Sequence, residues 1–153
     1  HLYNFSLPLQ KIVEEIENRN AQHSKRLKKL DTAKQEITPP QHFGPDGAPV
    51  SLIGWGSTIG PALEALKMLN AEKPVAQYWH VTDIWPFPAR EMGRIVANAN
   101  MAIIVEGNAM GQLARLIQAE TGFCMDHRIL KYDGRAFSPE FIVRGVKEVF
   151  PDA

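Results

Sequence analysis

From residue 50 onward, short apolar runs alternate with longer segments in which apolar residues recur at helical spacing. The runs VSLIGW, VAQYWHV and MAIIVE predict three buried strands, and MDHRILKY predicts a fourth. Helices are expected over 60–71, 88–99, 110–121 and 139–150. This alternation is typical of an α/β fold with three α/β/α layers and a mixed, mostly parallel sheet.

The segments before residue 50 have a different pattern. Residues 1–36 contain no glycine and place few apolar residues among many charges, which predicts an exposed helical arm. Residues 37–49 contain four prolines and two glycines and are interpreted as a linker to an α/β domain over 50–153. Because His1 stands where an initiator methionine would be, we expect the chain to be a piece of a longer polypeptide.

Charge and composition exclude several classes of partner. Seventeen basic residues balance seventeen acidic ones, so no overall charge favours nucleic acid or an anionic membrane. No apolar run approaches the roughly 20 residues of a membrane helix, and a cytoplasmic protein is expected. The single cysteine, Cys124, excludes an internal disulfide and is expected to be buried. Histidines are scattered without ligand spacing, so no metal site is predicted.

The glycine-rich turn after the first predicted strand is the strongest candidate for a ligand site. Gly54, Gly56 and Gly60 allow a tight turn, and Ser57 or Thr58 can cap the helix that follows. The loop after MAIIVE also precedes a helix, so both loops should share the edge where ligands of open α/β sheets bind. The candidate binding residues at this edge are Gly56, Ser57, Thr58, Glu106, Asn108 and Gln112. In the alternative, these glycines only tighten turns while Glu106 and Asn108 cap helices.

No catalytic residue is assigned from the sequence. The glycines do not have the spacing of a dinucleotide-binding fingerprint, no lysine follows them as in a phosphate loop, and no nucleophile elbow is present. His80 is expected to be a satisfied, partly buried histidine.

The segment 84–88 forms a rigid aromatic corner between a predicted strand and a predicted helix. Trp85 precedes Pro86 in it, and Phe87 lies between Pro86 and Pro88. These two side chains fit either the protein core or an interface with another subunit, and both alternatives stay open.

Four motifs together resemble the alpha subunit of 2-oxoacid:ferredoxin oxidoreductases. They are the segments 54–58, 85–88, 106–108 with 111–115, and 131–135 with 137–139, in order between residues 50 and 150. The resemblance implies a fold similar to the C-terminal domain of transketolase. It also implies a parent enzyme, of the 2-oxoglutarate or pyruvate type, that uses thiamine diphosphate, magnesium and an iron–sulfur cluster and transfers the acyl group to coenzyme A.

By the same resemblance, the partners are a thiamine-binding beta subunit, other domains of the enzyme, and ferredoxin. No cofactor is expected in this fragment, whose role would be structural and in assembly. Two alternatives remain, a free-standing nucleotide- or anion-binding module and a pure protein-interaction domain.

Overall fold

The computed structural model describes residues 16–153. Its helices are α1 (Ile16–Gln35), α2 (Ile59–Leu69), α3 (Ala89–Asn98), α4 (Gln112–Thr121) and α5 (Pro139–Val149). Its strands are β1 (Gln41–Phe43), β2 (Val50–Trp55), β3 (Ala76–Val81), β4 (Met101–Glu106) and β5 (His127–Leu130). A single 3-10 turn over Gly56–Thr58 joins β2 to α2.

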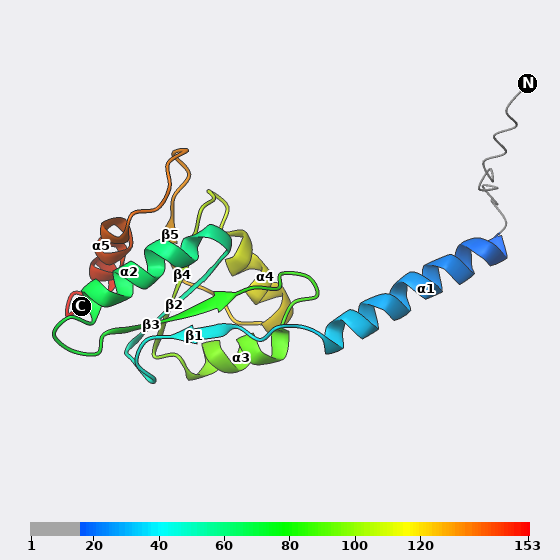
Figure 1. Ribbon diagram of the computed structural model, residues 1–153, viewed down its shortest axis with the longest axis horizontal. Coiled ribbons are helices and arrows are strands. Elements are labelled where there is room, and N and C mark those ends of the chain that lie inside the picture. The colour runs from blue at the N-terminus through cyan, green and yellow to red at the C-terminus, as the bar shows by residue number, and fades with distance from the viewer. Residues whose placement is uncertain (1–15) are drawn as a thin grey trace, which may run out of the picture. The chain divides into compact units, whose positions relative to one another are not determined.

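The five strands form one mixed sheet in the order β1-β3-β2-β4-β5 (Figure 1). Strands β2 to β5 are parallel, whereas β1 runs antiparallel to β3 at one edge. The first parallel strand, β2, lies between β3 and β4, so the chain adds strands first on one side of β2 and then on the other. The predicted α/β fold with a mixed, mostly parallel sheet is confirmed.

Helices cover both faces of the sheet. Helices α2 and α5 pack together over one apolar cluster, which includes Leu52, Tyr78 and Ile103 from the strands. Helices α3 and α4 contact each other over a second cluster, which includes Ile53 and Ile104. Because neighbouring residues of a strand face opposite sides, each central strand contributes apolar side chains to both clusters. This explains why the central strands read as mostly apolar runs.

The sequence prediction missed β1, which lies inside the segment interpreted as a linker. Its three residues pair with Tyr78, Trp79 and His80 of β3. The ring centroids of His42 and Trp79 lie 4.4 Å apart, and Phe43 packs against the α2 and α5 cluster. A three-residue edge strand held by such distant contacts has no local pattern of its own, and prolines are tolerated on either side of it.

Helix α1 belongs to a unit separate from residues 37–153. Its described side chains are exposed except for the half-buried Leu30 and Ala33, as expected for the helical arm. Lys34 and Asp31 form an exposed ion pair on it, with 3.6 Å between nitrogen and oxygen. The expected start of the helix after Pro8 lies outside the described residues. Across residues 16–153, no helix is long and apolar enough to cross a membrane.

Cys124 is exposed, so its prediction as a buried small side chain is wrong. It lies two residues after Gly122, which ends α4 in a left-handed conformation. The next residue, Met125, enters the α3 and α4 cluster instead and is buried. In the connection between α4 and β5, the methionine and not the cysteine is therefore the side chain that packs into the core.

Candidate functional site

The loops after β2 and β4 meet at the edge of the sheet where the parallel strands end, here called the carboxyl edge. The chain leaves β2 to enter α2 on one face, and it leaves β4 to enter α4 on the other face. Adjacent strands whose connections diverge in this way leave a crevice between the two loops, the usual ligand position in open α/β sheets.

An open hollow of about 420 Å³ occupies this crevice. We call it the strand-end hollow, and it is lined by Trp55, Gly56, Ser57, Thr58, Gly107, Asn108 and Gln112. Five of the six residues predicted as binding candidates therefore lie together, and only Glu106 is not part of the lining. The lining offers hydroxyl, carboxamide and indole groups and no charged side chain.

Glu106 is fully buried and holds the start of α4. Its carboxylate accepts hydrogen bonds from the backbone N–H groups of Leu113 and Ala114, each at 3.0 Å, and from the Asn108 carboxamide at 2.6 Å. The Asn108 carboxamide oxygen accepts from the N–H of Gly111 at 2.7 Å. The capping alternative thus holds for both residues. A carboxylate already occupies the positive end of the α4 dipole, so this helix start does not suit a phosphate.

Neither Ser57 nor Thr58 caps α2 through its side chain. The Thr58 hydroxyl instead donates to the carbonyl of Trp55 at 2.8 Å and lies 3.2 Å from the Tyr78 hydroxyl, which is 2.9 Å from Nδ1 of His80. Thr58 has a single hydroxyl hydrogen, so it accepts from Tyr78, and Tyr78 in turn accepts from the Nδ1–H of His80. The geometry therefore assigns His80 the tautomer with its proton on Nδ1 when the ring is neutral.

This buried chain explains the pKa shifts of its two titratable members. Burial raises the pKa of the Tyr78 hydroxyl to about 12, an effect that the hydrogen bond with Thr58 partly opposes. Burial lowers the pKa of the His80 imidazole. Both groups are therefore held in their neutral forms. His80 is hydrogen-bonded, as the sequence predicts, and it is buried where the sequence predicts partial burial.

Tyr78 should make the chain lose stability in alkaline solution. Its hydroxyl titrates near 10.0 when unfolded and near 12 when folded, so the unfolded chain loses the proton first as pH rises. The contribution of this group to the free energy of unfolding is complete below pH 10 and falls by about 1.4 kcal/mol per pH unit toward pH 12. We expect urea unfolding at several pH values to show this decline, and Tyr78→Phe to lack it.

The matched control is Tyr132→Phe, because Tyr132 is exposed. This variant should retain the alkaline decline of the unsubstituted chain. An equal decline in the Tyr78→Phe variant would show that Tyr78 is not the group responsible.

The two aromatic interface candidates occupy different environments. Phe87 is buried in the α3 and α4 cluster, so its placement at an interface is corrected and the core alternative holds for it. Trp85 is 70% exposed. Simple alternation along an extended chain would place both rings on one side, so the sequence did not indicate which ring would be inside.

Sequence reasoning also missed the role of Tyr78. Its hydroxyl reaches the carboxyl edge beneath the glycine turn, and it contacts His80 two residues along the same strand. The spacing of Tyr78 and His80 could have indicated their contact, because residues i and i+2 of a strand lie on one face.

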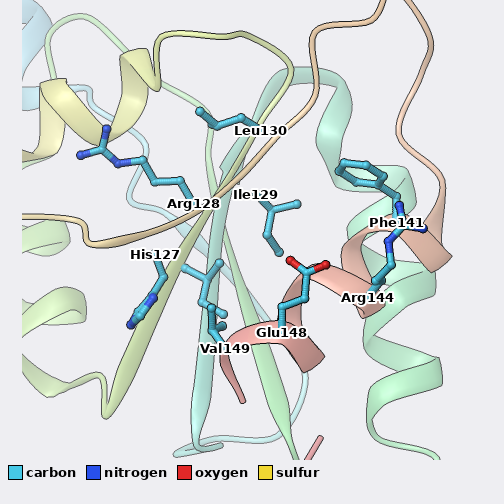
Figure 2. Close-up of a pocket in the computed structure, with 10 residues that line it drawn as sticks. His127, Arg128, Ile129, Leu130, Phe141, Arg144, Glu148 and Val149 are labelled. Carbon is cyan, nitrogen blue, oxygen red and sulfur yellow. The ribbon is translucent and has the colours of Figure 1, made fainter. Parts of the chain in front are cut away.

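A second hollow, of about 220 Å³, lies between β5 and α5 (Figure 2). Ile129, Phe141 and Val149 supply apolar surface, and Arg144 and Glu148 extend from α5 beside them. Gly145 lets α5 approach β5 here, since a Cβ atom on it would lie 2.8 Å from Cγ1 of Ile129. The hollow is therefore a gap in the packing between an outer strand and the helix that covers it, and charged side chains lie along it.

Gly145→Ala is expected to lower the free energy of unfolding by about 1–2 kcal/mol, because overpacking against buried Ile129 outweighs the better helix propensity of alanine. The matched control is Gly93→Ala in α3, where the nearest atom would be 3.8 Å from the new Cβ. That variant should stabilise the chain by about 0.5–1 kcal/mol. Urea unfolding of both variants tests the pair, and equal effects would contradict the close packing at Gly145.

The described residues do not fit the cofactors that the resemblance implies for the parent enzyme. Within residues 16–153, no group of three or more His, Cys, Asp or Glu side chains is placed to hold a metal ion. One cysteine in the whole sequence cannot ligate an iron–sulfur cluster by itself. The strand-end hollow has no cationic side chain for a diphosphate, and Glu106 occupies the start of α4.

Curated proteins similar to this chain are alpha subunits of 2-oxoacid:ferredoxin oxidoreductases. No protein-family model matches the chain. The alpha subunit of 2-oxoacid:ferredoxin oxidoreductase 1 from Aeropyrum pernix is 34% identical over 143 residues, which cover 90% of this chain and 22% of that subunit. The chain therefore spans about a fifth of the length of the curated relatives that it matches.

Solved structures similar to this chain include members of the same enzyme family. A 2-oxoglutarate:ferredoxin oxidoreductase from Magnetococcus marinus, with 2-oxoglutarate, coenzyme A and succinyl-CoA bound, is 32% identical with a TM-score of 0.76, over 89% of this chain and 24% of that one. The alpha chain of a probable 2-oxoacid ferredoxin oxidoreductase from Thermoplasma acidophilum is 30% identical with a TM-score of 0.53, over 74% of this chain and 97% of that one. A split-gene transketolase shares the fold alone, at 18% identity and a TM-score of 0.59, over 75% of this chain and 43% of that one.

Proposed function

Because the chain belongs to the family of 2-oxoacid:ferredoxin oxidoreductase alpha subunits, we propose that it is a structural and assembly domain of such an enzyme. The complete enzyme oxidatively decarboxylates a 2-oxoacid in the cytoplasm, transfers the acyl group to coenzyme A and passes electrons to ferredoxin. The observation that carries the proposal is the match to the Thermoplasma acidophilum alpha chain, of which this chain covers 97%.

In this proposal the reaction takes place outside this domain. Thiamine diphosphate with magnesium and the iron–sulfur cluster lie on other domains or on a beta subunit. The neutral lining of the strand-end hollow and the carboxylate at the start of α4 support this division. The same features oppose the alternative of a free-standing nucleotide- or anion-binding module.

The test is purification of the native enzyme through a tag on this chain. The tagged chain should bring down a complex that reduces ferredoxin only when a 2-oxoacid, coenzyme A and thiamine diphosphate are all present. We would assay 2-oxoglutarate first, because the Magnetococcus marinus relative is named for that substrate, and pyruvate second. A complex without 2-oxoacid-dependent activity would contradict the proposal.

The isolated chain supplies the complementary test. Calorimetric titration with thiamine diphosphate and magnesium should give no binding heat, and the chain alone should not decarboxylate either 2-oxoacid. Tight binding or turnover by the isolated chain would show that the division of labour is wrong.

A further inference from the structure

The carboxyl edge carries the three most exposed large apolar side chains of residues 37–153. Tyr132 is 72% exposed, Trp85 70% and Met110 53%. They belong to three separate loops, which follow β5, β3 and β4 respectively. Tryptophan, tyrosine and methionine are the residue types enriched where proteins bury surface against each other.

The strand-end hollow lies between these side chains. The loops that line it follow β2 and β4, and the sheet order places β3 on one side of β2 and β5 on the far side of β4. Parallel strands are about 4.8 Å apart, so the loops after β3 and β5 are separated by roughly 14 Å. A surface of this width around a shallow polar centre fits a protein surface better than a single small molecule.

Charge on this edge is nearly balanced. The charged residues in its loops and first helical turns, apart from buried Glu106, are Asp83, Arg90, Glu91, Arg115, Lys131, Asp133, Arg135 and Glu140. Lys131 and Asp133 pair with each other. The exposed Arg128 of β5 also reaches this edge, since its guanidinium would lie 3.3 Å from a Cβ atom on Gly111. Five positive and four negative groups give little net attraction for a charged partner, so we expect the occupant to be a largely apolar surface.

The polypeptide also enters the α/β unit at this edge. The N–H of Thr38 donates to the carboxylate of Asp83 at 2.6 Å, and Gln41 pairs with His80 near the end of β3. The chain thus enters the unit beside Asp83, two positions from Trp85. In a longer subunit, a preceding domain is joined to this edge through α1, so its docking is intramolecular and modest contacts suffice to hold it.

From these observations we propose that the carboxyl edge docks the rest of the alpha subunit. Trp85, Met110 and Tyr132 are the apolar anchors, and an uncharged polar group of the docked surface enters the strand-end hollow. The inference rests on the proposed function, since it assumes a longer subunit. In the curated relatives about four fifths of the subunit lies outside the matched region and is available as this occupant.

Hydrogen–deuterium exchange tests the proposal without any activity measurement. The isolated chain, the complete alpha subunit that carries it, and the whole enzyme would be compared at 0.1 and 0.5 M salt. We expect amides of the loops 82–88, 107–111 and 131–137 to exchange at least tenfold more slowly in the alpha subunit alone than in the isolated chain, at both salt concentrations. Loops at the opposite edge, 70–75 and 122–126, should exchange equally in all samples.

Other outcomes overturn the proposal. Protection that appears only in the whole enzyme would assign the edge to a partner subunit, and protection in a self-associated isolated chain would assign it to a second copy. No protection anywhere would show that the edge is free. An enzyme that lacks 2-oxoacid-dependent activity but shows the expected protection would instead contradict the proposed function alone.

Paired substitutions in the alpha subunit give the matched comparison. Trp85→Ser with Tyr132→Ser should abolish most of the protection at the carboxyl edge. Met68→Ser with Phe123→Ser removes two exposed apolar side chains at the opposite edge and should leave it unchanged. Equal protection in both double variants would overturn the role of the aromatic anchors.

Discussion

Replacing Glu106 with alanine is expected to lower the free energy of unfolding of this chain by about 4 kcal/mol. The side chain is fully buried, and its carboxylate accepts hydrogen bonds from the backbone of Leu113 and Ala114 and from Asn108. Hydrogen bonds to a charged acceptor contribute about 1.5–3 kcal/mol each, and the loss leaves buried N–H groups unsatisfied. The favourable interaction of the carboxylate with the α4 dipole is lost as well. Urea unfolding measures the change.

Two milder variants separate the parts of this effect. Glu106→Gln keeps the shape but presents an NH₂ group where a second acceptor is needed, so it should cost about half as much. Asn108→Ala removes a partly exposed cap and should cost about 1 kcal/mol. An alanine variant at Glu106 that loses less stability than the one at Asn108 would contradict the buried cap.

The sheet was predictable because its central strands carry their own signal. Covered on both faces, β2 and β4 read as mostly apolar runs, and both begin and end where the sequence indicates. Strand β1 carries no such signal, since it is held by β3 and by contacts of His42 and Phe43 with distant residues. Its formation depends on tertiary structure that a local pattern cannot report.

The location of the candidate site was predictable, but the direction of its side chains was not. Strands that run parallel end at one edge, which is enough to bring the loop after β2 and the loop after β4 together. Whether the last residue of β4 faces the crevice or the helix depends on register and on where α4 begins. Glu106 turns inward to the α4 backbone, so a residue chosen as a possible ligand contact is a structural cap.

Gly54 at the end of β2, Gly56 in the turn after it and Gly60 at the start of α2 should respond very differently to alanine. At Gly54 the new Cβ would lie 2.7 Å from the Thr58 hydroxyl oxygen and 2.9 Å from that of Tyr78, both held in the buried hydrogen-bonded chain. We expect Gly54→Ala to lower the free energy of unfolding by about 3 kcal/mol, from overpacking together with disruption of buried hydrogen bonds.

The other two glycines are internal controls for this prediction. Gly56 has a φ of 58° and nothing within 4 Å of a Cβ, so Gly56→Ala carries only the strain of the left-handed conformation, about 1 kcal/mol. Gly60 lies in the first turn of α2 with open space around it, so Gly60→Ala should be neutral or slightly stabilising. Thermal and urea unfolding should rank the losses of stability in the order Gly54, Gly56, Gly60.

Adding Tyr78→Phe to Gly54→Ala removes one of the two colliding oxygens, so the double variant should lose less stability than the sum of the single losses. Additive losses would mean that Gly54 is required for some reason other than its closeness to Tyr78.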